Sequence, residues 1–186
     1  MAVQQRELTL EAFLKRPERK PALEFVGGRV TQKVPPKAKH SVLQFQMAAR
    51  LNRFSEPPKL AFAFPELRAT FAGASVVPDV SVFVWDRIAR DAVGEPLDDV
   101  FLPPDIAVEI RSPSQRARVG SERCLWYVEN GVQIAVLVDP IARSVSLFRP
   151  GTDPLVLQGD AEINLGEVLP GFQLTVRELF DSLKLV

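Results

Sequence analysis

The chain has 186 residues, of which 46% are hydrophobic and 25% are charged, a composition typical of one folded domain rather than a disordered or fibrous chain. Its 23 basic and 23 acidic residues cancel, so any site for a polyanion must be a local patch. The single cysteine, Cys124, and the single histidine, His40, exclude an internal disulfide and a zinc cage of the usual kind. With a polar N-terminus and no long apolar run, the sequence predicts a cytoplasmic location and no contact with a membrane.

The first half of the chain predicts a short helix, a hairpin, a long helix and several strands. A helix capped by Thr9 should end at Pro17, and two strands should follow, joined by a turn at Gly27 and Gly28. From 39 to 54, apolar residues recur at helical spacing, which predicts an amphipathic helix. Three further strands are predicted downstream, at 60–64, 67–71 and 79–85.

The second half is dominated by a predicted strand, helix and strand in succession. After a loop or short helix at 86–104, residues 105–111 alternate polar and apolar side chains, as a strand does. A helix over 116–129 and the apolar strand 134–138 complete a β-α-β unit, whose two strands should be parallel. The loop at 112–115, after the first strand, is where α/β sheets usually bind ligands. Two more strands and a closing helix are predicted at 144–149, 154–158 and 175–183.

These elements predict one mixed α/β (α+β) domain with a central sheet flanked by helices. No motif for nucleotide, zinc or serine-hydrolase chemistry is present, and two acids at strand positions remain. Asp79 follows Pro78 at the head of one strand, and Glu109 lies within another. Two buried carboxylates on neighbouring strands are costly unless they are paired or bind a hard cation such as Mg²⁺. Taken singly, each has a structural explanation: a turn residue for Asp79, and an ion pair with Arg111 for Glu109.

The order of several motifs resembles the Uma-two family, which is classed with restriction endonucleases in the PD-(D/E)XK nuclease superfamily. The superfamily pattern of Pro-Asp on one strand and Glu-x-Lys on another is matched by "PD" at 78–79 and "EIR" at 109–111. The family pattern continues in "LEFVGGRV", "PPDIAVEIRSPS", "RCLWYVENGV", "VLVDP" and "LPGFQLTVRELF". The resemblance implies a single restriction-endonuclease-like domain over 1–186, with a helix and hairpin at 1–37, a nuclease core at 38–149, and C-terminal strands and a helix at 150–186.

The resemblance also implies the residues and the cofactor of a site that cleaves phosphodiesters. Asp79 and Glu109 would bind Mg²⁺ or Mn²⁺, with the carbonyl of Ile110 as a further ligand. The lysine of the family, which stands either on the second strand or on the following helix, corresponds to Arg111 or Arg123. Two further matches complete the candidate site, namely the acid Glu24 and the helix-borne His40.

Arginine at both lysine positions leaves two functions open. Arg111 and Arg123 keep a positive charge and can bind phosphate, but arginine stays protonated and is poorly suited to accept a proton from water. The resemblance implies a metal-dependent endonuclease that acts on nucleic acid, DNA before RNA, as a homo-oligomer whose two sites cut two strands. The alternative is a catalytically impaired relative that binds nucleic acid or has a structural role.

Two basic segments lie next to these candidates in the sequence. Residues 29–40 contain no acid, and residues 111–123 contain only Glu122. Such clusters are what a surface needs to contact a phosphate backbone. The same charges also suit an ordinary solvated loop and helix, because few aromatic residues are interleaved with them.

Overall fold

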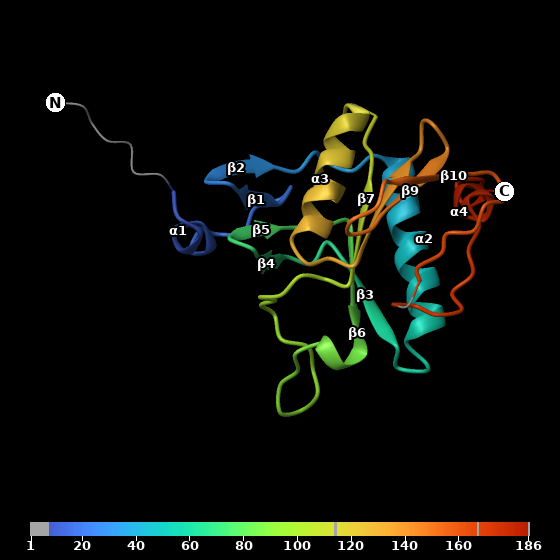
Figure 1. Cartoon of the computed structure of the whole chain (residues 1–186). Helices are drawn as coiled ribbons and strands as arrows, with labels where there is room; N and C mark the ends of the chain where they lie inside the picture. The colour runs from blue at the N-terminus through green and yellow to red at the C-terminus, as the bar shows by residue number, and fades with distance from the viewer. Residues whose placement is uncertain (1–7, 114, 167, 186) are drawn as a thin grey trace.

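The computed structural model describes residues 8–113, 115–166 and 168–185 and shows two β-sheets with helices around them (Figure 1). The predicted fold class, a single mixed α/β domain with a sheet flanked by helices, is confirmed. No helix among these residues is both long and apolar enough to cross a membrane. The helices are α1 (Leu10–Leu14), α2 (Ala38–Ser55), α3 (Ala117–Glu129) and α4 (Val176–Asp181), with a 3₁₀ turn, η1, at Trp85–Arg87.

The larger sheet has six strands and is antiparallel except at its centre. There β7 (Ile106–Ile110) and β8 (Ile134–Asp139) run parallel and are joined by α3, as the sequence predicts for the β-α-β unit. Every other neighbouring pair is antiparallel. The strand order is β10 (Leu155–Gln158), β9 (Ser144–Phe148), β8, β7, β6 (Val80–Val84) and β3 (Ala61–Pro65).

The smaller sheet adds an element that the sequence analysis missed. Its order is β2 (Arg29–Gln32), β1 (Leu23–Val26), β5 (Ala74–Val76) and β4 (Ala69–Phe71), all antiparallel. The β1–β2 turn contains Gly27 and Gly28, as predicted. The missed element is β5, for which the sequence analysis predicted no strand. The β4–β5 turn consists of Ala72 and Gly73, with φ angles of 49° and 71°. Alanine rarely adopts a positive φ, so this turn has only a weak sequence signal.

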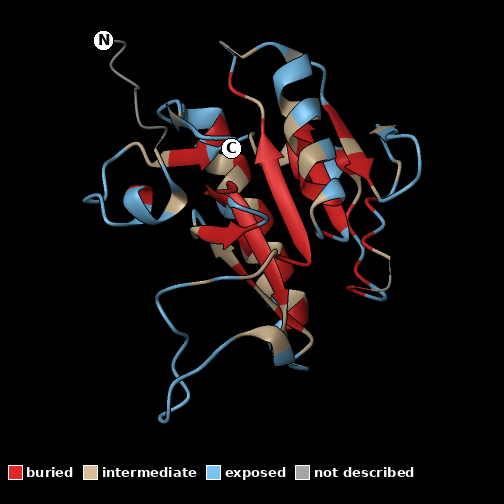
Figure 2. Ribbon diagram, turned by 60° about the vertical axis from the view of Figure 1, so that its left-hand side comes forward, coloured by how far each residue is buried: buried red, intermediate tan, exposed pale blue. Residues whose placement is uncertain are grey.

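Both faces of the large sheet are covered, so its central strands are buried throughout (Figure 2). Ile106, Val108 and Ile110 belong to the core cluster that contains the buried apolar residues of α2 and α4. Ala107, between them, packs instead with Cys124 of α3. Because side chains of a strand alternate between faces, Glu109 lies on the α3 face.

Asp105 joins the end of β6 to the starts of β7 and β8. Its buried carboxylate accepts hydrogen bonds from the backbone N–H of Val84 at 2.8 Å and from the Gln133 side chain at 2.6 Å, and it pairs with Arg87. Its backbone carbonyl accepts from the N–H groups of Gln133 and Ile134. A buried acid is stable here because all of its partners are donors.

Replacing Asp105 with alanine should destabilise the fold. The change removes the buried acceptor of the Val84 N–H and of the Gln133 amide, so we expect the free energy of unfolding to fall by roughly 2–4 kcal/mol. Urea denaturation followed by circular dichroism measures this loss. Asp98→Ala, at an exposed position of the 86–104 loop, is the control. A loss no larger than that of the control would show that Asp105 is dispensable.

Candidate active site

The candidate site lies where the chain passes from the small sheet to the large one. Residues 77–79 connect β5 to β6. Both backbone groups of Val77 are bound by side chains from the β1–β2 hairpin and the residue after it. Its N–H donates to Glu24 Oε1 at 2.7 Å, and its carbonyl accepts from Lys33 Nζ at 2.7 Å. These bonds hold the hairpin against the connection and bring its polar side chains to the head of β6.

Asp79 and Glu109 are brought together on neighbouring strands. β6 and β7 pair antiparallel with Val80 opposite Val108, and one further step of this register places Asp79 opposite Glu109. Opposed residues of an antiparallel pair project from the same face of the sheet. The N–H of Ile110 donates to Asp79 Oδ2 at 2.7 Å, which orients the carboxylate. The two acids that the sequence singles out therefore share the face covered by α3.

Asp79 is buried, and both of its carboxylate oxygens are bound. Oδ1 accepts a hydrogen bond from Lys33 Nζ at 2.6 Å, and Oδ2 lies 3.0 Å from His40 Nε2. Burial alone would raise the pKa of Asp79, but the hydrogen bond from His40 and the charge of Lys33 outweigh it and lower the pKa to about 2. Asp79 is therefore an anion at neutral pH.

His40 and Gln44 place α2 against Asp79. They lie one helical turn apart, and Gln44 donates to the backbone carbonyl of Asp79 at 2.8 Å. Because the Asp79 carboxylate is an anion and can only accept, its contact with His40 requires a proton on His40 Nε2. Nδ1 is buried and has no hydrogen-bond partner among the described residues. In the arrangement described, His40 thus acts as a donor to Asp79.

Glu109 is held by two side chains of α3. Its Oε1 accepts hydrogen bonds from Arg123 Nε and from Tyr127 Oη, both at 2.7 Å. Burial raises the pKa of Glu109 in spite of the Arg123 charge, and the Asp79 charge adds to the rise. Burial also raises the pKa of Tyr127, so this side chain is neutral and donates. Both bonds fall on Oε1, so neither of these two side chains occupies the second oxygen of Glu109.

Arg123 joins Glu109 to an acid of the small sheet. Its Nη1 and Nη2 donate to the two oxygens of Glu24 at 2.7 and 2.5 Å, while its Nε donates to Glu109. These three bonds use the planar fork of the guanidinium, which the point charge of a lysine cannot reproduce. Arg123 is therefore a clamp between two acids from different sheets.

Lys33 is a site residue that the sequence analysis places only in a basic segment. Its Nζ contacts Asp79, and 14% of its side chain is exposed. Burial alone would lower the pKa of Lys33, but the charges of Asp79 and Glu109 outweigh it and raise the pKa, so Lys33 is an ammonium. The hairpin register could have identified it. Glu24 pairs with Thr31, and Lys33, two residues farther on, should project from the same face.

These side chains line one cavity of about 250 Å³. Several of the lining residues, among them Val34 and Val119, are exposed, so the cavity reaches solvent. Arg111 is not among the lining residues, since its guanidinium donates to Asp139 at 2.6 Å and to the Gln115 carbonyl at 3.0 Å. Of the 112–115 loop, residue 114 lies outside the described residues. The predicted site residues that do line the cavity are Glu24, His40, Asp79, Glu109, Ile110 and Arg123.

The donor chemistry of the cavity suits a hard divalent cation. Asp79, Glu109 and Ile110 all line the cavity, and carboxylate and carbonyl oxygens are the ligands that Mg²⁺ prefers. In the arrangement described, Lys33 and Arg123 already bind these two carboxylates. Among the described residues, no three His, Cys, Asp or Glu side chains form a group that could hold a metal ion. The oxygen donors thus suit a metal ion in kind, but two of them are already bound to Lys33 and Arg123.

Comparison with known proteins gives the family. The profile of the Uma2 family, described as "Putative restriction endonuclease", matches residues 10–177. The chain belongs to the Uma2 family. A crystal structure from Anabaena variabilis ATCC 29413, described as a "putative nuclease belonging to DUF820", superposes with a TM-score of 0.90 at 36% identity, over 95% of this chain and 99% of that one. A DrdV–DNA complex solved by cryo-EM aligns with 64% of this chain and 12% of that one, at 12% identity and a TM-score of 0.32, which is too low to support an argument. No curated protein matches the chain.

The Uma2 match confirms the resemblance that the sequence motifs carry, and the Anabaena structure confirms the fold. The roles of the individual site residues stay predictions. The geometry supports those of Asp79 and Glu109, which share one cavity, and gives none to Arg111.

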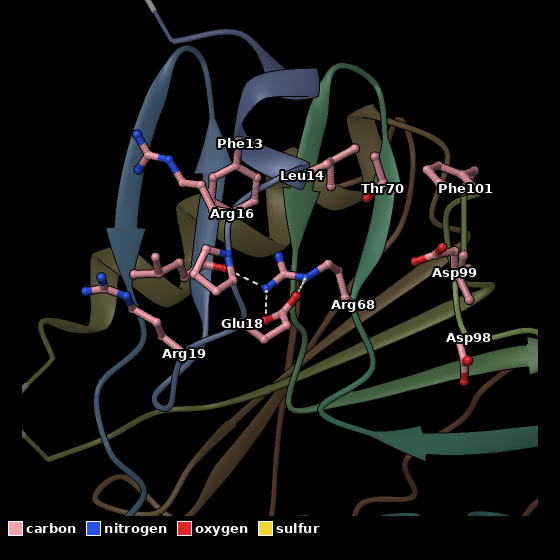
Figure 3. A pocket seen from close by; sticks show the side chains of 13 residues that line it. Phe13, Leu14, Arg16, Glu18, Arg19, Arg68, Thr70, Asp98, Asp99 and Phe101 are labelled. Atoms are coloured by element: carbon pink, nitrogen blue, oxygen red, sulfur yellow. Dashed lines mark hydrogen bonds and ion pairs between the residues drawn. The ribbon is translucent and has the colours of Figure 1, made fainter.

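A second cavity, of about 170 Å³, lies between α1, the small sheet and residues 98–101 (Figure 3). Arg68 lies in it and donates to both carboxylate oxygens of Glu18, at 2.9 and 3.0 Å, and to the Leu23 carbonyl at 3.0 Å. These bonds tie the segment after α1 to the small sheet. Arg68 is thus paired within the chain itself.

Arg123 should stabilise the protein by keeping two buried acids paired. Arg123→Met leaves Glu24 and Glu109 without their shared cation, so we expect the free energy of unfolding to fall by about 3–5 kcal/mol. Arg123→Lys keeps the charge but loses the fork, and its stability should lie in between. Urea denaturation gives these values, with Arg116→Met, at an exposed position just before α3, as the control. Equal losses for Arg123→Met and Arg116→Met would contradict the proposed clamp.

Proposed function

We propose that this protein is a metal-dependent endonuclease that hydrolyses phosphodiester bonds in nucleic acid, with DNA as the expected substrate. The observation that carries the proposal is the convergence of Asp79 and Glu109, from adjoining strands, with Lys33 in one cavity that is open to solvent. Membership of the Uma2 family and the likeness to a protein described as a nuclease support the same reaction class.

The groups that would hold Mg²⁺ or Mn²⁺ are Asp79, Glu109 and the Ile110 carbonyl. When bound, such an ion lowers the pKa of a coordinated water and neutralises charge on the phosphate. Hydrolysis adds water to phosphorus and breaks one P–O ester bond, so negative charge grows on the phosphate oxygens. Arg123, fixed in place by Glu24, supplies a preorganised positive charge in the cavity for that change.

The surroundings of the cavity suit a phosphate backbone. Lys37 and Lys39 are exposed at the start of α2, and Arg116 is exposed at the start of α3. Both helices begin on the same side of the molecule (Figure 1). Helix N-termini carry partial positive charge and attract phosphate groups. We expect this side of the protein to face the nucleic acid.

The pairing of all three acids favours a second candidate function. In the arrangement described, Glu24, Asp79 and Glu109 are each bound to an internal cation, Lys33 or Arg123. A protein that kept this pairing permanently would bind nucleic acid without cutting it. For an active enzyme, one site cuts one strand, so we expect two copies of the chain to act together on duplex DNA.

Cleavage assays test the proposed function. We expect the wild type to nick supercoiled plasmid DNA in the presence of Mg²⁺ or Mn²⁺ and to lose this activity in EDTA. Asp79→Asn and Glu109→Gln should lower the rate by about 100-fold or more, because each removes an anionic oxygen ligand. Agarose gels give the rates, and single-stranded DNA and RNA tested in parallel give the substrate preference.

Asp153→Asn, at an exposed position between β9 and β10, is the matched control and should cut DNA at the wild-type rate. Wild-type rates for Asp79→Asn would overturn the proposal. Tight DNA binding by the wild type without cleavage, with either metal ion, would instead establish the second candidate function.

A further inference from the structure

We propose that Lys33 is the lysine of the active site and that it competes with the metal ion for Asp79. Lys33 holds Asp79 in the metal-free site and contacts the substrate phosphate after a metal ion has taken its place. This inference rests on the proposed function. It assigns the role to a residue outside the two positions, Arg111 and Arg123, that match the lysine positions of the family.

The competition follows from how the two oxygens of Asp79 are used. Oδ2 is occupied by two groups, the Ile110 N–H at 2.7 Å and His40 Nε2 at 3.0 Å. Oδ1 is therefore the oxygen that remains for a metal ion, and Lys33 Nζ lies 2.6 Å from it. An ammonium and a metal ion cannot both occupy that position. Across from it, Glu109 has one oxygen that neither Arg123 nor Tyr127 binds.

Of the two internal cations, Lys33 is the one that can move. Arg123 is fixed by three hydrogen bonds to Glu24 and Glu109, and its guanidinium lies over the Tyr127 ring at 5.4 Å from the centroid. Lys33 has two hydrogen bonds, to Asp79 and to a backbone carbonyl, at the end of a flexible four-carbon stem. Its side chain already reaches solvent at the cavity, where a phosphate would enter.

The charges of the cavity agree with this exchange. Three acids, Glu24, Asp79 and Glu109, face two permanent cations, Lys33 and Arg123. A divalent ion added to this set would leave an excess of positive charge in a largely buried space, which is unfavourable. If Lys33 leaves Asp79 and pairs with the incoming phosphate, both the carboxylates and the phosphate are neutralised. Metal binding and substrate binding should therefore favour each other.

Mn²⁺ titration by calorimetry tests the competition without any substrate. We expect Lys33→Met to bind Mn²⁺ about tenfold tighter than the wild type, because the competing ammonium is gone. The same variant should cut plasmid DNA about 100-fold more slowly, because the cation that contacts the phosphate is gone. Lys33→Arg, which keeps a cation, should bind Mn²⁺ much as the wild type does.

Lys39→Met controls for the loss of one positive charge near the site, since Lys39 is exposed and lies outside the cavity lining. Its Mn²⁺ affinity should equal that of the wild type. Thermal unfolding shows whether each variant is folded, and Lys33→Gln replaces Lys33→Met if the latter is not. An unchanged or weaker Mn²⁺ affinity after loss of Lys33 overturns the inference, even if the wild type binds metal and cuts DNA as proposed. If Lys33→Met binds Mn²⁺ tighter while the wild type cuts no nucleic acid, the proposed nuclease function fails and the competition for Asp79 is supported.

Discussion

The buried carboxylate of Asp79 is the interaction on which the arrangement of the site depends. It accepts hydrogen bonds from Lys33 after β2, from His40 at the start of α2 and from the Ile110 N–H in β7. The first partner directly follows the β1–β2 hairpin of the small sheet, the second belongs to a flanking helix and the third to the large sheet. Because a buried carboxylate is costly without donors, these three parts of the chain are held together at one point. The cavity exists where they meet.

The cavity gathers more charged side chains than joining the two sheets and the helix would require. Glu24 and Glu109 lie beside Asp79, and the cations of Lys33 and Arg123 relieve their mutual repulsion. A hydrophobic core could join two sheets and a helix without any of these groups. Opposed pKa shifts, lowered for Asp79 and raised for Glu109 by its burial, are characteristic of functional sites. These shifts support the proposal that the cluster binds a charged ligand.

The sequence predicted most helices and strands because their apolar spacing is regular, and it predicted the pair of Asp79 and Glu109 because both acids interrupt apolar strands. It missed β5, since the turn before it places Ala72 at a positive φ, which alanine seldom adopts. It also offered Arg111 as a match to the family lysine, and the structure does not place this residue among those that line the cavity. Alternation along a strand gives the face of a side chain but not its partner, and the partner of Arg111 is Asp139, 28 residues away. Long-range pairing of this kind requires the strand order of the sheet.

Arg123 and Lys33 have different contacts in the cavity, and the side-chain type at each position suits its contacts. A guanidinium offers donors in several directions and binds Glu24 and Glu109 at once, which an ammonium at the same position could not do with equal geometry. The clamp holds the small sheet against the large one, so the charge of Arg123 stays fixed at one place in the cavity. A cation that must leave a carboxylate and follow a phosphate needs the opposite properties, a compact charge and a flexible stem. Lys33 has a compact charge and a flexible stem. Thr31 of β2 pairs with Glu24, and Lys33, two residues after Thr31, projects from the same face as these two residues.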